Sequence, residues 1–100
     1  NDQAFQLASK ARRLAPQSAS IQDTYGVISL SRGDLGQALA AHREAYSLAP
    51  DNLDIQMNLA KALVQTGNKE EAKTLLVEIG RSIDPARREE VAKLLEKARQ

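Results

Sequence analysis

The chain has 100 residues, a hydrophobic fraction of 42% and a formal net charge of +1. This length allows one compact domain or a few helical hairpins, and the apolar fraction is typical of a folded chain, which excludes general disorder. The near balance of acids and bases excludes a large field of one sign. Cysteine is absent, so disulfides, thiolate catalysis and the usual structural zinc sites are excluded.

Alanine and leucine supply most of the apolar residues, which favours helices over strands. No apolar run approaches the roughly 20 residues that span a bilayer, and no signal peptide begins the chain. Pro16 and Pro50 each follow a helical segment and end it, and Asp84-Pro85 is typical of a helix start. Six helices are predicted, over residues 2–14, 19–32, 35–48, 53–66, 69–80 and 86–99.

Two helix junctions use the same residue types. Gly33 and Gly67 can take the left-handed conformation that ends a helix, and Asp34 and Asn68 follow them as caps of the next helix. Gln37 and Glu71 lie three residues after these caps, and this spacing predicts two capping boxes. The very short junctions predict antiparallel helical hairpins.

The sequence repeats itself at an interval of 34 residues. Leu14-Ala15-Pro16 matches Leu48-Ala49-Pro50, and Gly33 matches Gly67. A fixed period of this length predicts a stacked helical solenoid, in which neighbouring hairpins bury a continuous core. The predicted units are the second helix of a truncated repeat over 1–17, complete repeats over 18–51 and 52–85, and a C-terminal capping helix over 86–100.

The two ends of this array are predicted to differ. The first helix lacks its hairpin partner, so the chain is expected to be a fragment with an open stacking face that carries Phe5. The last helix has apolar residues along one side and charged residues elsewhere, which is typical of a terminal repeat. Its apolar side consists of Val91, Leu94, Leu95 and Ala98.

These features resemble the tetratricopeptide repeat (TPR), a helix–turn–helix unit of 34 residues. The resemblance is carried by Gly26, Gly33, Ala38, Ala45 and Pro50, and again by Leu59, Ala60, Gly67 and Ala72. It implies an all-α solenoid of about six antiparallel helices in a right-handed superhelix. It also implies a non-catalytic scaffold that binds a protein or peptide partner.

A narrower resemblance concerns Asp23-Thr24-Tyr25-Gly26, the Leu-Ala-Pro endings and Asn58-Leu59-Ala60. These look like the C-terminal repeats of bacterial TPR lipoproteins associated with exosortase and exopolysaccharide (PEP-CTERM) systems. This resemblance implies an envelope or periplasmic scaffold with a lipidated N-terminus upstream. Without it, a cytoplasmic location is the expectation.

In the family, the first helix of each repeat lines a concave groove. Carried onto this chain, that implies a peptide-binding surface whose first polar contacts are Asp23, Asn58 and Lys61. The alternative is that these are ordinary solvated positions of a curved stack. A carboxylate clamp for C-terminal tails is excluded, because an acid at position 23 would repel a terminal carboxylate. The groove residues are Ser20, Asp23, Thr24, Val27, Leu30 and Ser31, with Asp54, Met57, Asn58, Lys61, Val64 and Gln65.

Other functions find little support in the residues. His42 is the only histidine and is predicted to be a partly buried packing residue, because no second ligand or nucleophile is spaced to assist it. No catalytic, cofactor or metal site is predicted, and no nucleic-acid or direct membrane contact. The alternative function is end-to-end self-assembly, as a homodimer through the exposed N-terminal helix.

Overall fold

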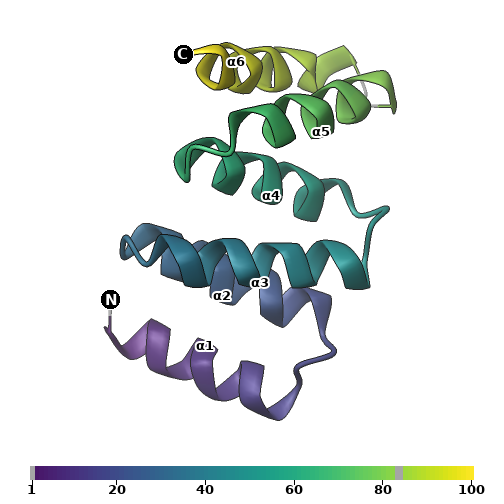
Figure 1. The fold of residues 1–100 in the computed structure, drawn as a ribbon. Helices are drawn as coiled ribbons and strands as arrows, with labels where there is room; N and C mark the ends of the chain where they lie inside the picture. Colours follow the sequence, from purple (N-terminus) through teal and green to yellow (C-terminus); the bar gives the residue numbers. More distant parts are fainter. Residues whose placement is uncertain (1, 83–84) are drawn as a thin grey trace.

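The computed structural model describes residues 2–82 and 85–100, and within them it is all-helical, without strands. The helices stack one after another from the N-terminus to the C-terminus (Figure 1). This confirms the all-α, TPR-type architecture. The elements are α1 (Asp2–Leu14), α2 (Ala19–Ser31), α3 (Leu35–Leu48), α4 (Leu53–Gln65), α5 (Lys69–Ser82), the 3₁₀ helix η1 (Pro85–Arg87) and α6 (Arg88–Arg99).

The two glycine junctions form the tight turns that the sequence predicts. Gly33 has a φ of 83° and Gly67 a φ of 82°, both in the left-handed region that only glycine enters at low cost. The amide of the next residue then reaches back to a helix carbonyl, Asp34 N to Ser29 O at 2.9 Å and Asn68 N to Leu63 O at 2.9 Å. Each turn therefore joins two antiparallel helices, giving the hairpins α2–α3 and α4–α5.

The predicted capping boxes are wrong. The Asp34 side chain makes no capping hydrogen bond, and Gln37 instead accepts from the Tyr25 hydroxyl at 2.6 Å. The Glu71 carboxylate accepts from both Arg43 Nη atoms, which lie on another helix. Long-range partners thus outcompete the local bond. Ser18 caps the start of α2 and Asn52 caps the start of α4, each through a side-chain hydrogen bond.

The chain between α5 and α6 also differs from the prediction. Helix α5 continues to Ser82 and not to residue 80, and α6 begins at Arg88 after a 3₁₀ turn over Pro85–Arg87. A proline without an amide hydrogen and with a fixed φ suits that short turn. Asp84, the first residue of the predicted helix start, lies outside the described residues.

The helices form two layers. Helix α4 contacts both α2 and α6, so these three helices form a continuous inner layer. In the described residues the backbones of α1 and α3, and those of α3 and α5, do not come into contact. Helices that touch on one side and separate on the other make a curved stack, with α2, α4 and α6 on its concave side.

Small residues allow the helices to approach one another closely. Ala38, Ala60 and Ala72 are fully buried, and larger apolar residues close around them. The main cluster lies between α4, α5 and α6 and includes Leu63 and Leu76. Among the described residues, no helix has the length and apolar character that crossing a membrane requires.

The prediction that Phe5 lies on an open N-terminal face is wrong. Its ring packs against Tyr25 of α2 with centroids 5.6 Å apart, and the Arg32 guanidinium lies 4.1 Å above the Phe5 ring. The exposed apolar residues of α1 are Leu7 and Leu14, with 64% and 76% of their surface accessible. Phe5 therefore packs α1 against α2 and is not an exposed contact for a partner.

Candidate functional site

Helices α2 and α4 expose two hollows on the concave side. The first, about 340 Å³, lies at the N-terminal ends of the two helices, where it is lined by Ser20, Asp23 and Asp54 among others. The second, about 320 Å³, lies along their C-terminal halves. Because α2 and α4 lie in the same layer, both hollows face the same side. The second hollow is lined by Val27, Leu30, Ser31, His42, Asn58, Lys61 and Gln65.

A hydrogen bond between the two helices separates these hollows. Asn58 Nδ2 donates to Asp23 Oδ2 at 3.0 Å. The other carboxylate oxygen, Asp23 Oδ1, lies 3.1 Å from Nδ1 of His42 on α3. Asp23 therefore holds a side chain on each neighbouring helix.

Ion pairs continue the inner surface toward α6. Lys61 Nζ lies 3.6 Å from Glu90 Oε1, and Arg87 Nη1 lies 3.6 Å from Asp54 Oδ1. These side chains remain substantially exposed. Solvent-exposed pairs at such distances contribute little stability. The two pairs keep the charged groups at the surface, where each group can still form an ion pair with a different partner.

The structure does not bring all the predicted groove residues together. Thr24 is exposed but lines neither hollow. Met57 is only 1% exposed and belongs to the main apolar cluster, so its side chain is not accessible to a partner. A buried Met57 and a half-buried Asp23 occupy equivalent helix positions, which periodicity alone cannot distinguish.

His42 is more deeply buried than the sequence predicts, with 1% of its surface exposed. It reaches from α3 to Gly26 of α2, where an added Cβ would lie 2.7 Å from ring atoms Cε1 and Nε2. The glycine therefore makes room for the imidazole. His42 Nε2 is buried and has no hydrogen-bond partner, and Ser29 Oγ shares this property.

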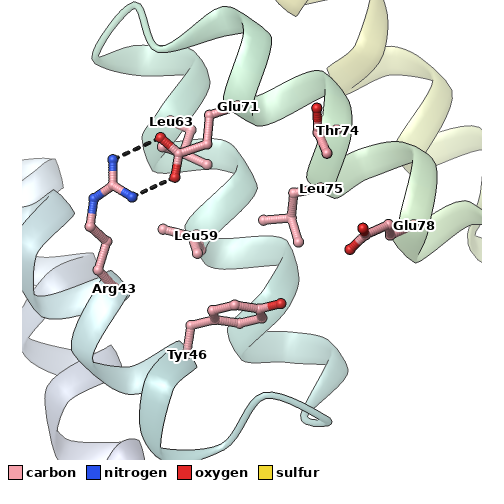
Figure 2. Close-up of a pocket in the computed structure, with 8 residues that line it drawn as sticks. All are labelled: Arg43, Tyr46, Leu59, Leu63, Glu71, Thr74, Leu75 and Glu78. Atoms are coloured by element: carbon pink, nitrogen blue, oxygen red, sulfur yellow. Dashed lines mark hydrogen bonds and ion pairs between the residues drawn. The ribbon is translucent and has the colours of Figure 1, made fainter.

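An outer cleft of about 460 Å³ opens where α3 and α5 separate, with α4 beneath it (Figure 2). Arg43 and Glu71 pair across it, which raises the pKa of Arg43 and lowers the pKa of Glu71 through the hydrogen bonds between them. Tyr46, Leu59 and Leu75 give the cleft an apolar lining. Sequence analysis missed this cleft because it arises from the spacing of helices that are not neighbours in the chain.

The described residues contain no cluster of three or more His, Asp or Glu side chains that could hold a metal ion. Residues 29–98 match the profile of the tetratricopeptide repeat. The chain belongs to the tetratricopeptide repeat family. None of the curated proteins matches it.

Repeats of this family generally mediate protein–protein interactions and are generally not catalytic. A functional site is therefore expected on a surface that a protein partner can reach. The concave hollows combine rigid helices, exposed polar groups and one buried polar atom without a partner. The buried atom without a partner is Nε2 of His42. The sequence indicates it only in that a histidine stands where the equivalent position, 34 residues later, has Leu76.

Proposed function

We propose that the protein binds a peptide or a helix of a protein partner across the concave surface of α2 and α4. The observation that carries the proposal is the pair of hollows there, one at each end of the two helices. Side chains on packed helices can bind a partner with little loss of conformational entropy. The contacts are assigned to Ser20, Asp23, Thr24, Val27, Ser31, Asp54, Asn58, Lys61 and Gln65.

The charges of the two hollows suit a partner of mixed charge. The N-terminal hollow carries Asp23 and Asp54, whereas the other carries Lys61. A peptide that crosses both hollows meets acids at one end and an ammonium group at the other. Such complementarity sets the orientation and specificity of binding more than its strength.

Selection of displayed random peptides on the immobilised chain tests the proposal. Selected peptides are expected to lose at least about tenfold in affinity for the double variant Asn58→Ala/Lys61→Ala, as for the loss of a hydrogen bond and a charge contact. Thr74→Ala/Glu78→Ala, in the outer cleft, is the matched control and should bind normally. Circular dichroism checks that both variants fold.

Two results would reject this function. Either no selected peptide binds the folded chain, or binding survives the Asn58/Lys61 change and fails with the outer-cleft control. The second result would move the partner to the cleft between α3 and α5.

The setting of this scaffold is also a proposal. The resemblance of Asp23-Thr24-Tyr25-Gly26 to bacterial exosortase-associated lipoproteins supports a role in the envelope, within a longer array linked to exopolysaccharide export. Cell fractionation and mass spectrometry of the N-terminal peptide of the full-length protein test this idea. A full-length protein confined to the cytoplasm, without a lipid, contradicts it.

Self-assembly through α1 is the second candidate function. Leu7 and Leu14 are both strongly exposed, and their spacing of seven residues places them on one face of the helix. Light scattering across a concentration series is expected to show a dimer that Leu7→Glu/Leu14→Glu converts to monomer. Concentration-independent monomer would reject it. Phe5 is unsuitable as a test because it packs on Tyr25.

A further inference from the structure

Two of the three aromatic rings of the chain are covered by an arginine of the chain itself. The guanidinium carbon of Arg12 lies 4.5 Å from the centre of the Tyr25 ring, and that of Arg32 lies 4.1 Å from the centre of the Phe5 ring. The face of an aromatic ring attracts cations in this way. Among the described residues, no arginine or lysine lies over the third ring, Tyr46.

The Tyr46 ring is accessible from the outer cleft between α3 and α5. It packs against the main apolar cluster but is only partly buried, and it lines the cleft. A smaller hollow of about 270 Å³ extends past Tyr46 to Pro50 and Asp51, in the loop after α3. Tyr46, Leu75 and Glu78 line both spaces, so the ring lies where the two spaces meet.

Two carboxylates without an ion-pair partner lie at this junction. Glu78 and Asp51 are exposed, and in the part of the chain that the structure describes neither forms an ion pair. Figure 2 shows the Tyr46 ring entering the cleft from α3 and the Glu78 carboxylate entering it from α5. Arg43 and Glu71, also in the cleft, compensate each other. The charge left beside Tyr46 is therefore negative and complementary to a cation.

The cations nearest to Glu78 along α5 do not neutralise it. Lys73 pairs with Glu70 at 3.1 Å. Arg81 lies one turn after Glu78 and forms no ion pair with any described residue. Lys73 and Arg81 line a separate hollow on α5, and neither lines the cleft.

Arginine suits this arrangement better than lysine. A guanidinium is planar, so it can stack on a ring while its N–H groups donate to an oxygen at the edge of its plane. The two internal arginines do both: Arg12 Nε donates to Gln22 Oε1 at 2.9 Å, and Arg32 Nη1 donates to Asp2 Oδ1 at 2.6 Å. A lysine ammonium is a compact, strongly hydrated charge that lacks this geometry.

We propose that the outer cleft binds an arginine side chain of a protein partner, with the guanidinium over the Tyr46 ring and its N–H groups donating to Glu78. Asp51 adds negative charge beside that contact. The cleft lies between α3 and α5, whereas the concave hollows lie between α2 and α4, so this contact does not depend on the peptide proposed to bind there. A single side-chain contact is weak, so it anchors a partner that touches the outer surface and does not by itself retain a displayed peptide.

The 34-residue repeat does not require an aromatic ring at this position. The residues 34 positions before and after Tyr46 are Arg12 and Gly80. The residues at the position of Glu78 in the two earlier units are Lys10 and Glu44. The ring with an acid facing it is therefore a property of this cleft and not of the repeat.

Three blocked amino acids serve as probes: the N-acetyl methylamides of arginine, citrulline and lysine. Citrulline has nearly the shape of arginine without its charge, and lysine has the charge without the planar group. Tyr25 and Tyr46 are the only tyrosines, so a sample with ¹³C-labelled tyrosine rings gives two sets of NMR ring signals. Arg12 already covers the Tyr25 ring, which makes Tyr25 the internal control.

The arginine probe is expected to shift the Tyr46 ring signals in a saturable manner and to leave those of Tyr25 unchanged. The lysine probe should bind about threefold more weakly, because it loses the stacking and the paired hydrogen bonds. The citrulline probe should bind at least about tenfold more weakly, because it loses the charge that both the ring and the carboxylates attract.

Substitutions identify the groups that bind the probe. Tyr46→Leu removes the ring and Glu78→Gln removes one charge, and each should weaken binding of the arginine probe by about threefold to fivefold. The backbone amide signal of Thr74, which also lines the cleft, reports binding in both variants. Glu44→Gln is the matched control, because Glu44 is an exposed acid of α3 that lines neither space. If Tyr46→Leu does not fold, Glu78→Gln and the three probes still decide.

Three results would overturn the inference. Absence of a saturable Tyr46 shift would mean that the cleft holds no cation, and equal affinity for arginine and citrulline would mean that charge plays no part. Equal weakening by Glu78→Gln and Glu44→Gln would mean that the probe responds to overall charge and not to the cleft. Light scattering tests the source of the arginine. Concentration-dependent association that Glu78→Gln abolishes would assign the arginine to a second copy of the chain and reject a separate partner.

Discussion

The hairpins α2–α3 and α4–α5 share a backbone plan but differ in what they bury. In the second hairpin, Met57, Leu63 and Leu76 are almost completely inaccessible and pack within the main apolar cluster. In the first, the equivalent positions are Asp23, Ser29 and His42. Ser29 and His42 are as deeply buried as their counterparts, yet each has a polar atom without a partner.

This difference shows that the polar set is not a requirement of the fold. The second hairpin builds the same turn, with Gly67 in place of Gly33, around purely apolar residues. Burying an unpaired polar group costs about 1–3 kcal/mol. The proposed binding at the concave surface would give a reason outside packing for keeping these polar groups.

The largest expected effect comes from placing an aspartate, the residue type at position 23 of the first hairpin, at the equivalent position 57 of the second hairpin. Met57→Asp buries a carboxylate with no imidazole opposite, since Leu76 occupies that position. It should lower the free energy of unfolding by about 3–5 kcal/mol. Urea denaturation measures this change. The control variant Met57→Leu should lower the free energy of unfolding by less than about 1.5 kcal/mol. A loss below 1 kcal/mol for Met57→Asp would mean that the second hairpin is not a dry core.

The second prediction concerns the fit between Gly26 and His42. Gly26→Ala places a Cβ 2.7–2.8 Å from three ring atoms of His42, and overpacking of this kind costs about 1–3 kcal/mol. With His42→Leu present, the same change should stabilise by up to about 1 kcal/mol, because alanine favours the helix. A double-mutant cycle measures this coupling. Additive effects of the two changes would show that the ring does not depend on the glycine.

The third prediction concerns Ser29. Ser29→Ala removes a buried hydroxyl without a partner, so the free energy of unfolding should rise by about 1 kcal/mol. Leu63→Ala, at the equivalent position, should instead lower it by about 2–5 kcal/mol because it leaves a cavity. Thermal and urea unfolding of the two variants give the comparison. Destabilisation by Ser29→Ala would show that the hydroxyl contributes to the native state.

The smallest expected effect concerns the pair that joins the two hairpins, Arg43 and Glu71. Its hydrogen bonds lower the pKa of Glu71, so its stabilisation is fully present above the unfolded pKa and is lost as pH falls through the folded value. Arg43→Gln should return the Glu71 pKa to its ordinary range. Because both groups are exposed, the stability change at pH 7 should stay under about 1 kcal/mol. NMR titration of Glu71 measures the shift, and an unchanged pKa in the variant would contradict the pairing.

The fold was largely predictable because local chemistry determines it. Gly33 and Gly67 end helices through their own backbone freedom, and the 34-residue period places both hairpins. The capping boxes failed because Gln37 and Glu71 have partners on other helices, Tyr25 and Arg43. Such choices depend on the distances between helices, which the sequence does not display.

The candidate site was predictable only as a face of the molecule. Periodicity places Asp23 and Asn58 on neighbouring inner helices, and the structure adds that they bond each other at 3.0 Å. Periodicity also places Met57 there, although it lies in the core. The depth of His42 and the outer cleft depend on how helices from different hairpins pack, so neither could be predicted from one helix at a time.

The most direct test converts the first hairpin to the residues of the second. The triple variant Asp23→Met/Gly26→Ala/His42→Leu replaces three inner positions by their equivalents from α4 and α5. If the polar set is kept for binding, the free energy of unfolding in urea should rise above that of the unaltered chain. A fall in that free energy would mean that Asp23 and His42 stabilise the hairpin, and it would contradict the account.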